Sequence, residues 1–482
     1  MENTNKRTLI NNICKVLSIV SLALTAIFFV YLINLNMLPI KYFLRLLIII
    51  TILYTLFLLF IIPKNIKLGF KISSTILMFI ISLILFLVGF VYIDKAIDFI
   101  DKIDNSIVQK ENYNLLVLNT SHKTSIEELN NGIIGVYNSN LGLGNLDKAL
   151  NLLGKKISFK QNKYDDLKLM LEDLTNKVID AVLINDSVIS IIESDLSYLN
   201  ISMKKIDTIA ILVEQADIAK YVDVTNTPFN IYIAGSDSYG SIDKITNTDV
   251  NMVVTVDPVG HKLLLTSIPR DYYVKIPGLN GMDKITHAGY YGIQTSVETV
   301  ENLLDIEINY YAKVNFSTVK EVVDAIGGIT VYNEFSFCMV ESPEVCFKSG
   351  NIHLDGYRAL MYARERKTFS TGDVQRVKNQ QKVLSAVVKK ITTSSSIITN
   401  YAEILDSISN NFTTNMEYDS ISNLVKKQLN DMKGWTITSQ NLTGHDLYTT
   451  ETYSYPGMSL YVMQQDEQSI NEAKQKIKEV MN

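Results

Sequence analysis

Three long stretches without a charged side chain lie near the start of the chain, and they constrain its fold more than any other feature. They occupy residues 16–35, 46–63 and 72–93. Each is close to the roughly 20 apolar residues that an α-helix needs to cross a bilayer. The sequence therefore predicts a membrane anchor over residues 1–93, with transmembrane helices at about 16–38, 43–63 and 72–93.

The basic residues around these stretches indicate how the anchor is oriented. Three cations precede the first stretch and three separate the second from the third, whereas only Lys41 and Arg45 lie between the first and the second. Because cytoplasmic loops are enriched in Lys and Arg, we expect the N-terminus in the cytoplasm and everything after Ile93 outside it. No small-residue cleavage site follows the first stretch and two more spans do, which argues against a cleaved signal peptide.

The rest of the chain, residues 94–482, has room for two soluble domains. Residues 94–110 combine helical apolar spacing with many charges and predict a juxtamembrane helix. Residues 111–224 alternate short apolar strands with helical segments, which predicts a small extracellular α/β accessory domain, an interaction or spacer module. The same alternation over residues 225–482 predicts a larger α/β domain, also extracellular.

The charge of the exported part excludes one class of partner. The whole chain has a net charge of −5 although its first 93 residues are basic, so the exported part is strongly acidic. An acidic domain without a basic face argues against DNA or RNA as the ligand.

Two of the three cysteines, Cys338 and Cys346, lie in the exported part. An even pair outside the cytoplasm favours a disulfide. The segment FCMVESPEVCF, with Pro343 between the two cysteines, suits a hairpin that is closed near its base. The alternative is two free thiols under a loop.

The distribution of arginine singles out one segment, YARERKTFSTGDVQR at residues 362–376. The chain has 45 Lys and Arg residues, yet the exported part uses Arg at five positions only: Arg270, Arg358, Arg364, Arg366 and Arg376. Lysine would serve on a solvated surface, whereas the planar guanidinium grips an oxyanion with two donors at once. We therefore expect this region to bind a ligand with two anionic groups, most simply a pyrophosphate.

Two carboxylates are expected at adjoining strand ends. Asp237 follows the strand FNIYIAGS and Asp249 opens the next strand, at the edge where open α/β sheets bind their ligands. Two such carboxylates can share Mg²⁺ or Mn²⁺, whose shell is completed by water and substrate phosphate. The alternative for Asp237 is a turn or helix cap. Arg270 follows a third strand, KLLLTSI, and the alternative for it is a structural ion pair with Asp271.

Several long motifs then resemble the LytR-CpsA-Psr family. They occur in the order of that family between Phe229 and Lys390: GSDS, TDVNMV, LLLTSIPRDYYV, DKITHAGYYG, ENLLDIEINYYAKVNF, VVDAIGGITVYN and HLDGYRALMYARER with GDVQRVKNQQKV. The anchor and the additional domain look most like the members that attach capsules. The resemblance implies an α/β/α sandwich with a central mixed sheet and a hydrophobic channel for a polyprenyl tail.

The resemblance also implies an activity and a location. Such proteins are bacterial plasma-membrane phosphotransferases that depend on a metal ion. They move a glycan, for a capsule or another wall polymer, from an undecaprenyl pyrophosphate carrier to a peptidoglycan hydroxyl. Capsule or wall assembly proteins are the further partners that the resemblance implies.

The matching positions imply a role for each candidate residue. Asp237 and Asp249 would hold Mg²⁺ or Mn²⁺, and the pyrophosphate would be bound by Arg270, Arg364, Arg366, Arg376 and Gln380. Arg364 and Arg366 should lie on an extended segment. Arg376 should lie on the following helix, on the same helix face as Gln380. Asp373 would act as a base or would orient Arg376, and both roles stay open. Arg358 matches no phosphate contact.

One position departs from the pattern of the family. Two residues before Asp249, where the family usually has Arg, this chain has Asn247, and Lys244 would compensate only as a point charge. Two alternatives therefore stand beside the ligase. One is a non-catalytic binder of lipid-linked glycan that recruits assembly enzymes, and the other is a polyprenyl pyrophosphate hydrolase in which water replaces the acceptor.

Overall fold

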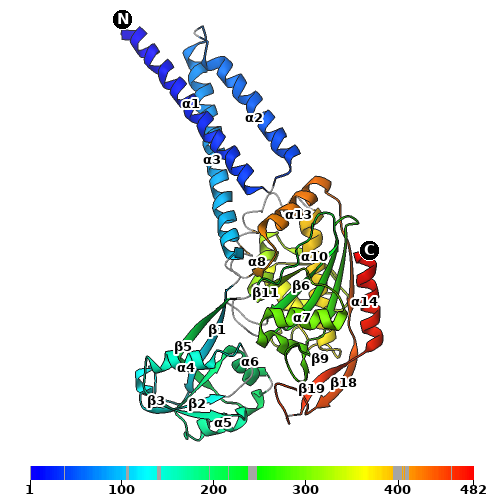
Figure 1. The fold of residues 1–482 in the computed structure, drawn as a ribbon. Coiled ribbons are helices and arrows are strands. Elements are labelled where there is room, and N and C mark those ends of the chain that lie inside the picture. Colours follow the sequence, from blue (N-terminus) through cyan, green and yellow to red (C-terminus); the bar gives the residue numbers. More distant parts are fainter. Residues whose placement is uncertain are drawn as a thin grey trace.

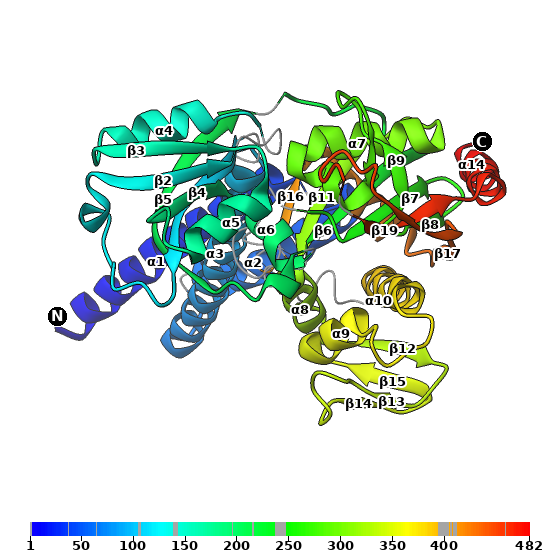
Figure 2. The ribbon, with the colours of Figure 1, turned by 90° about the horizontal axis from the view of Figure 1, so that it is seen from below.

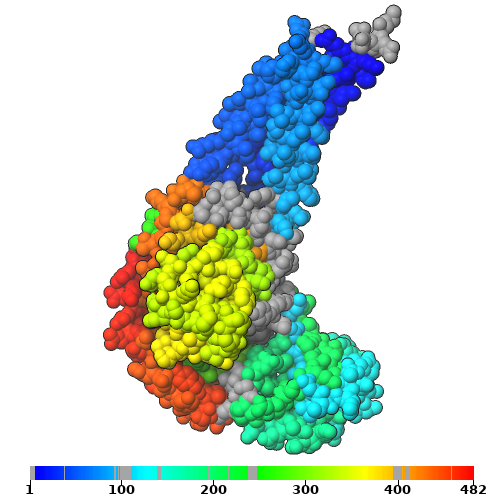
Figure 3. Space-filling view, turned by 180° about the vertical axis from the view of Figure 1, so that it is seen from behind, coloured from blue at the N-terminus to red at the C-terminus, as the bar shows by residue number. Residues whose placement is uncertain are grey.

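The computed structural model consists of a helical anchor, a small domain and a large domain (Figure 1). Seen from behind, the anchor helices stand away from two lobes that the small and large domains form (Figure 3). The structure describes residues 2–36, 38–63, 65–104, 108–137, 143–194, 196–214, 216–236, 247–393, 404, 407, 412–457 and 459–482.

The anchor is built from three long helices, α1 (Glu2–Leu35), α2 (Ile40–Ile61) and α3 (Leu68–Asp104). Each contains a segment that is long and apolar enough to cross a membrane. Buried hydroxyl groups join the three helices, because Tyr54 Oη lies 2.8 Å from Thr25 Oγ1 and 2.6 Å from Ser82 Oγ. Such hydrogen bonds fix which helix faces meet in an apolar bundle, where lipid offers no other polar partner.

The end of α3 differs from the prediction. The juxtamembrane helix expected at 94–110 is the last part of α3, which runs without a break to Asp104, and residues 108–110 already belong to strand β1. The segment DKAIDFIDKID contains neither Gly nor Pro, so nothing in it ends a helix that has already formed.

The small domain is a five-stranded mixed sheet with helices. Its strand order is β3-β2-β4-β1-β5, with β2 parallel to β3 and β4, and β1 antiparallel to β4 and β5. The strands are β1 (Val108–Leu118), β2 (Gly132–Tyr137), β3 (Phe159–Tyr164), β4 (Ala181–Asn185) and β5 (Met203–Glu214). The helices are α4 (Leu146–Gly154), α5 (Leu167–Thr175) and α6 (Asp186–Ser194).

The large domain is organised around a six-stranded mixed sheet in the order β16-β11-β6-β7-β8-β17. The strands are β6 (Phe229–Ser236), β7 (Val250–Asp257), β8 (Lys262–Ile268), β11 (Tyr310–Asn315), β16 (Phe412–Thr414) and β17 (Thr436–Asn441). β11 is parallel to β6 and β17 is parallel to β8, whereas β6, β7 and β8 alternate in direction. Their near-continuous apolar residues are buried on both faces, as expected of strands covered by helices.

Helices cover both faces of this sheet (Figure 2). α7 (Ile293–Leu304) and α14 (Glu467–Met481) pack on one face, in a cluster that includes Tyr232 and Val253. α8 (Phe316–Ala325), α9 (Gly356–Arg364) and α10 (Asp373–Thr393) lie on the other side. The predicted α/β/α sandwich with a mixed central sheet is confirmed.

Further elements surround the sandwich. They are β9 (Tyr273–Lys275), β10 (Met282–Lys284), the 3-10 helix η4 (Ile285–Tyr291), β12 (Ile329–Asn333), β13 (Phe337–Cys338), β14 (Cys346–Phe347), β15 (Gly350–Leu354), α13 (Tyr418–Asp431), β18 (Gly444–Thr449) and β19 (Leu460–Gln465).

The anchor docks on one end of the large sheet. Lys41 Nζ donates to the carbonyl of Asn430 at 2.6 Å, and Tyr418 Oη donates to the carbonyl of Leu35 at 2.7 Å, so the α1–α2 connection is tied to α13. α13 ends at Asp431, which lies 3.5 Å from His261 in the turn between β7 and β8. The other end of the eight-residue β7 is then roughly 23 Å farther along the strand, at about 3.3 Å per residue.

The small domain packs against η4 and the β18–β19 region of the large domain. Ile191 and Leu196 of the small domain share one buried apolar cluster with Tyr290, Tyr455 and Leu460 of the large domain. The two domains are therefore joined by part of a common core.

A buried ion pair lies next to this contact. His287 Nδ1 is 2.7 Å from Asp283 Oδ1, and each of the two side chains is at most 2% exposed to solvent. The amide and hydroxyl of Ser454 donate to the other carboxylate oxygen. Burial acts to raise the pKa of Asp283, but the charge and hydrogen bond of His287, together with these donors, outweigh burial and lower the pKa below its usual value.

Replacing Asp283 with Asn should destabilise the large domain by about 3 kcal/mol, because His287 stays buried without its counter-charge. The pKa of Asp283 is lower in the folded than in the unfolded protein. Its ionised carboxylate therefore contributes its full stabilisation at pH values above the unfolded-state pKa of about 4. This stabilisation is lost as the pH falls through the lower folded-state pKa. Urea unfolding of the full-length protein, followed by the fluorescence of Trp435, the one tryptophan in the chain, measures both effects. The exposed control Glu479→Gln should behave as wild type, and equal stability of Asp283→Asn at pH 7 would contradict the prediction.

Candidate active site

The candidate site lies at the end of the large sheet that is remote from the anchor. The register pairs Gly235 of β6 with Val250 of β7, and Asn251 of β7 with Ile268 of β8. The end of β6, the start of β7 and the end of β8 therefore meet at one edge. Asp249 and Arg270 lie just beyond this edge, as the sequence predicts from their positions next to the strands.

Asp249 and Arg270 form a close ion pair there. Arg270 Nη1 lies 2.5 Å from Asp249 Oδ1, and the Asp249 side chain is only 3% exposed. The distance from Arg270 Nε to Asp271 is 3.8 Å, so the pair with Asp249 is the tighter one. Asn247 Nδ2 donates to the second oxygen of Asp249 at 3.2 Å. The residue that departs from the family pattern thus contacts the carboxylate that it precedes.

Backbone hydrogen bonds to η4 hold this pair in place. Thr248 N–H donates to the carbonyl of Thr286, and Thr286 N–H donates to the carbonyl of Arg270, both at 3.1 Å. Lys284 Nζ lies 3.2 Å from Asp271, with its side chain buried. The motif DKITHAGYYG gave no reason to expect these contacts, because they join segments that are distant in the sequence.

Arg376 enters the site from the first turn of α10, as predicted. Its side chain is 4% exposed, and Nη2 lies 2.5 Å from Oδ1 of Asp373, the first residue of the helix. This ion pair lacks hydrogen-bond geometry: Nε and Nη2 of Arg376 find no acceptor within the described part of the chain. A buried guanidinium in this state retains donors that an oxyanion could use.

The charges of three arginines act on Asp373. Burial raises the pKa of this carboxyl; the charge of Arg376 opposes the rise, that of Asp271 adds to it, and those of Arg270 and Arg366 oppose it. Arg270, Arg366 and Arg376 are therefore close enough to act on one carboxylate, although they come from three separate segments. A carboxyl with a raised pKa can accept a proton more readily than an ordinary Asp.

The position of Arg364 differs from the prediction. Arg364 is the last residue of α9, and only Glu365 and the residues after it leave the helix, so the two arginines do not share an extended segment. Asp355 caps this helix by accepting from the amide of Arg358, and the buried side chains of Leu360 and Tyr362 extend its apolar face towards the end. Arg364 packs with Cζ 4.1 Å from the centre of the Phe316 ring, at the start of α8.

Two further residues, Asp237 and Gln380, were predicted for the site. Asp237 lies outside the described residues, directly after the end of β6. Gln380 is half-buried on α10, but its neighbour Gln381 joins the helix to the sheet, since Gln381 Nε2 donates to Ser267 Oγ at 2.9 Å and Asn441 Oδ1 at 2.7 Å.

The described residues supply half of the predicted metal site. Asp249 has the oxygen ligands that Mg²⁺ or Mn²⁺ prefers, but its two oxygens already contact Arg270 and Asn247. Among the described residues, no three His, Cys, Asp or Glu side chains are grouped so that they could hold a metal ion. The metal stays a prediction that depends on Asp237.

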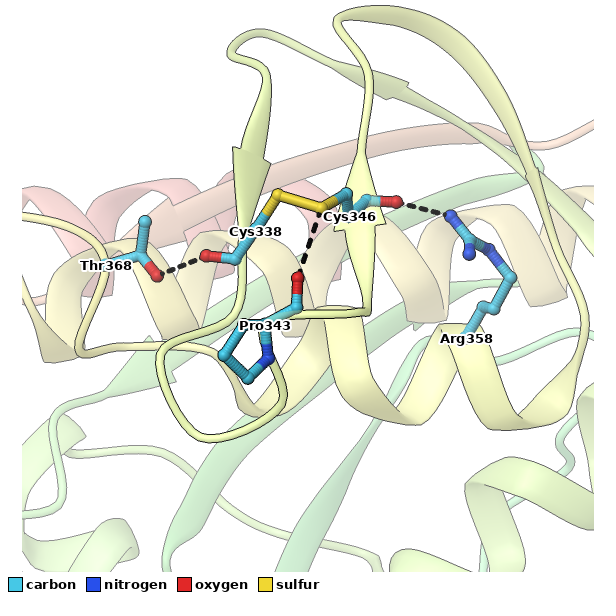
Figure 4. The surroundings of a disulfide bond; sticks show 5 residues. All are labelled: Cys338, Pro343, Cys346, Arg358 and Thr368. Carbon is cyan, nitrogen blue, oxygen red and sulfur yellow. Dashed lines mark hydrogen bonds between the residues drawn. A yellow bond between two sulfur atoms is a disulfide. The ribbon is translucent and has the colours of Figure 1, made fainter.

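A disulfide hairpin supports the loop that carries Arg366 (Figure 4). Cys338 and Cys346 form a disulfide that links β13 to β14. The carbonyl of Cys338 accepts from Thr368 Oγ1 at 2.9 Å, and Glu341 in the same hairpin lies 2.5 Å from Lys367 Nζ. The arginine left outside the site by the sequence analysis has a structural contact here, since Arg358 Nη2 donates to the carbonyl of Cys346 at 2.7 Å.

Replacing both Cys338 and Cys346 with Ser should loosen the Arg366 loop, because a short-loop disulfide contributes roughly 2–3 kcal/mol. We expect the amides of residues 365–372 to exchange hydrogen faster than in the wild type, while those of β1 and β5 in the small domain keep their rates. Mass-spectrometric hydrogen exchange on the full-length protein measures this. If the rates over 365–372 do not change, the hairpin does not support the loop.

Comparison with known proteins places this geometry in a family. The model of the LytR_cpsA_psr family matches residues 196–478, more than half of the chain. Among similar proteins is a Bacillus anthracis (strain CDC 684 / NRRL 3495) protein named polyisoprenyl-teichoic acid–peptidoglycan teichoic acid transferase TagU. It is 39% identical over 207 residues, which are 43% of this chain and 66% of the relative, just under two thirds of its length.

A second relative is covered more fully. The protein of the same name from Bacillus subtilis (strain 168) is 33% identical over 282 residues, 57% of this chain and 87% of its own. Similar solved structures include B. subtilis TagV, at 31% identity, a TM-score of 0.45 and coverage of 53% and 98% of the two chains. Another is TagT bound to LIIa-WTA, at 27% identity, a TM-score of 0.43 and coverage of 55% and 94%. The family match and the B. subtilis relative show that the chain belongs to the LytR-CpsA-Psr family.

Proposed function

We propose that the protein is a membrane-anchored phosphotransferase. It transfers a glycan polymer, for a capsule or another wall polymer, from an undecaprenyl pyrophosphate carrier to a peptidoglycan hydroxyl. The observation that carries the proposal is the grouping of charge at this edge of the sheet. Arg270 pairs with Asp249, and the buried Arg376, 2.5 Å from Asp373, retains donors without an acceptor among the described residues. The relatives, named as transferases from polyisoprenyl-teichoic acid to peptidoglycan, support the same reaction class.

The arginines are suited to holding a pyrophosphate. Each guanidinium can donate two parallel hydrogen bonds to phosphate oxygens, and those of Arg376 are partly unused within the described residues. Arg366 is exposed on its loop, so it can reach a ligand that arrives from outside. Arg364 adds a fourth positive charge, with its guanidinium stacked on Phe316.

The reaction that these groups favour is an in-line displacement. The acceptor oxygen forms a bond to the phosphorus that carries the glycan, while the bond from that phosphorus to the bridging oxygen breaks. The electron pair leaves with polyprenyl phosphate, whose growing negative charge the arginines neutralise. Asp373 accepts the proton of the acceptor hydroxyl in its role as a base. Mg²⁺ or Mn²⁺, when held by Asp237 and Asp249, would supply further charge neutralisation.

The position of the site suits an acceptor in the wall. The anchor docks at the β7–β8 turn, and the site lies at the opposite end of these strands. In this proposal the reacting phosphorus lies away from the membrane surface, because the small and large domains lie on one side of the anchor (Figure 1). With the N-terminus in the cytoplasm, that side is the outside of the bacterial plasma membrane.

Arg366→Ala and Asp249→Ala should each lower transfer by about 10²–10³-fold. Arg366→Ala removes a positive charge that neutralises the leaving phosphate, and Asp249→Ala removes the partner that positions Arg270 and a proposed metal ligand. The assay supplies the full-length protein in detergent with lipid-pyrophosphate glycan, peptidoglycan oligomers and Mg²⁺, and measures the joined product. Arg358→Ala, which removes an exported arginine that lies outside the site, should transfer nearly as fast as wild type. Unchanged transfer by both site variants would refute the proposal, and equal phosphate release without acceptor would indicate a hydrolase.

The pH dependence should report Asp373. A base must be ionised, and burial raises the pKa of this carboxyl, so kcat/KM should fall with decreasing pH at values above the usual 3.8. Asp373→Asn should remove this acidic limb and lower the rate by about 10²–10⁴-fold. If Asp373→Asn retains most of the rate and mainly raises KM, Asp373 orients Arg376 instead. Rate profiles of wild type and variant at saturating and limiting donor distinguish the two roles.

A further inference from the structure

Helix α13 lies along the connection between α1 and α2, at the end of the large domain that faces the anchor (Figure 1). Hydrogen bonds join the two at helical spacing: Tyr418 bonds to Leu35, Ser422 and Lys426 bond to Asn36, and the carbonyls of Leu429 and Asn430 accept from Tyr42 and Lys41. The connection lies between two helices of membrane-spanning length, so it emerges at a membrane surface. α13 is therefore held along that surface.

Four cations gather at this contact, and we call them the basic corner. They are Lys41 and Arg45 of α2, and Lys426 and Lys427 of α13. Lys41 Nζ lies 4.9 Å and Arg45 Cζ 5.8 Å from the centre of the Tyr42 ring, and Tyr42 Oη donates to the carbonyl of Leu429 at 3.2 Å. Residues 36–61 contain neither Asp nor Glu, and within the described part of the chain none of the four cations forms an ion pair.

The two cations of α2 lie in the first two turns of a helix that is apolar enough to span a membrane. Long basic side chains in such a position extend to the membrane surface, where their charge stays hydrated or meets an anion. Cations that have no carboxylate partner at this surface are available to the anionic groups of lipids.

A polar pocket of about 460 Å³ lies at the basic corner. It is lined by Asn423, Lys426, Lys427, Asn430 and Asp431 of α13, and by Thr225 and Asn226 in the turn before β6. The pocket borders the docked connection, because Lys426 Nζ also donates to Asn36 Oδ1 at 3.0 Å and the carbonyl of Asn430 accepts from Lys41. Its acidic residue, Asp431, lies 3.5 Å from His261. Two ammonium groups and several amides thus line one space, and such donors bind phosphate oxygens.

An apolar stripe follows the basic corner down α2. Ile40, Leu44 and Ile48 recur at every fourth residue, and their side chains are 71%, 46% and 56% exposed. Side chains at this spacing share one helix face, which in a membrane-spanning helix lies against lipid tails. The corner and the stripe together offer donors to a phosphate and an apolar surface to acyl chains. A phospholipid has both parts, whereas a soluble anion has only the first.

We propose that the basic corner binds an anionic phospholipid of the membrane that the anchor spans. The lipid phosphate contacts Lys426 and Lys427 in the pocket, Lys41 and Arg45 add positive charge beside it, and the acyl chains pack along the stripe of α2. A lipid bound in this way holds α13, and with it the large domain, at the membrane surface. The inference uses the anchor but none of the proposed transfer chemistry, because the candidate active site lies at the other end of β7 and β8.

Trp435 allows a binding test that does not depend on activity. It is the one tryptophan of the chain, and its Nε1 donates to Oε1 of Gln428, the neighbour of Lys427, at 2.7 Å. Full-length protein in detergent is titrated with phosphatidylglycerol, with zwitterionic phosphatidylcholine and with glycerol 3-phosphate, which has the anion without the chains. We expect a saturable change in Trp435 fluorescence with phosphatidylglycerol, and binding of the other two that is at least about tenfold weaker. Native mass spectrometry of the same samples measures the bound lipid directly.

The variant Arg45→Gln/Lys427→Gln should bind phosphatidylglycerol at least about tenfold more weakly, because it removes two charges of the corner. It keeps the hydrogen bonds between α13 and the connection, which other residues form. Arg45→Lys/Lys427→Arg keeps both charges and should bind as wild type. The matched control Lys474→Gln/Lys476→Gln removes two charges from α14, on the opposite face of the sheet, and should also bind as wild type. Urea unfolding of each variant verifies that it folds.

Three results would overturn the inference. The first is equal affinity for phosphatidylglycerol and phosphatidylcholine, and the second is equal binding of phosphatidylglycerol by Arg45→Gln/Lys427→Gln and the α14 control. The third is binding of glycerol 3-phosphate as tight as that of phosphatidylglycerol, which would indicate a site for a free phosphate. Arg366→Ala should bind phosphatidylglycerol as wild type although it loses transfer, so a failure of the lipid site and a failure of the proposed function are distinguishable.

Discussion

The ion pair between Asp249 and Arg270 connects most of what surrounds the candidate site. A carboxylate that is 3% exposed is costly to bury unless a cation and hydrogen bonds compensate it, and Arg270 and Asn247 supply both. The antiparallel register of β7 and β8 brings the two charges to one edge. Thr286 then bonds to the backbone on both sides of the pair, so η4 is fixed to the site. Because η4 also packs against the small domain, the position of these charges depends on contacts well outside the site.

The same sheet separates the chemistry from the membrane. One end of β7 and β8 is tied through α13 to the α1–α2 connection, and the other end carries the charged residues. The anchor is a packed bundle, since the hydroxyls of Thr25, Tyr54 and Ser82 join its three helices. A site held at a set distance from the anchor supports the proposed reaction, in which the donor is held in lipid and the acceptor lies in the wall. The disulfide hairpin makes a similar contribution locally, by supporting the loop of Arg366.

Much of this could be predicted from the sequence because the signals are local. Uncharged stretches of the length of a bilayer predict the helices of the anchor, and buried strands that end in polar residues place Asp249 and Arg270 at a sheet edge. The preference for Arg over Lys singled out residues 362–376, which contribute Arg366 and Arg376 to the candidate site. Local signals failed where an element continues without a stop. α3 extends to Asp104 and α9 includes Arg364, since neither Gly nor Pro occurs in residues 91–104 or in residues 357–364. The contact of Gln381 with the sheet could not be predicted, because it depends on which side of α10 faces the sheet.

The sequence by itself determined the membrane anchor, the α/β character of both exported domains and the types of residue that the site contains, because periodicity, charge and side-chain chemistry are properties of short segments. Only the tertiary structure decided which charges meet. The charges of Arg270, Arg366 and Arg376, which act on Asp373, come from three segments, and a groove joins α10 to strands of two sheets. Strand register and helix packing set these distances, and both result from burying apolar faces that lie far apart in the chain.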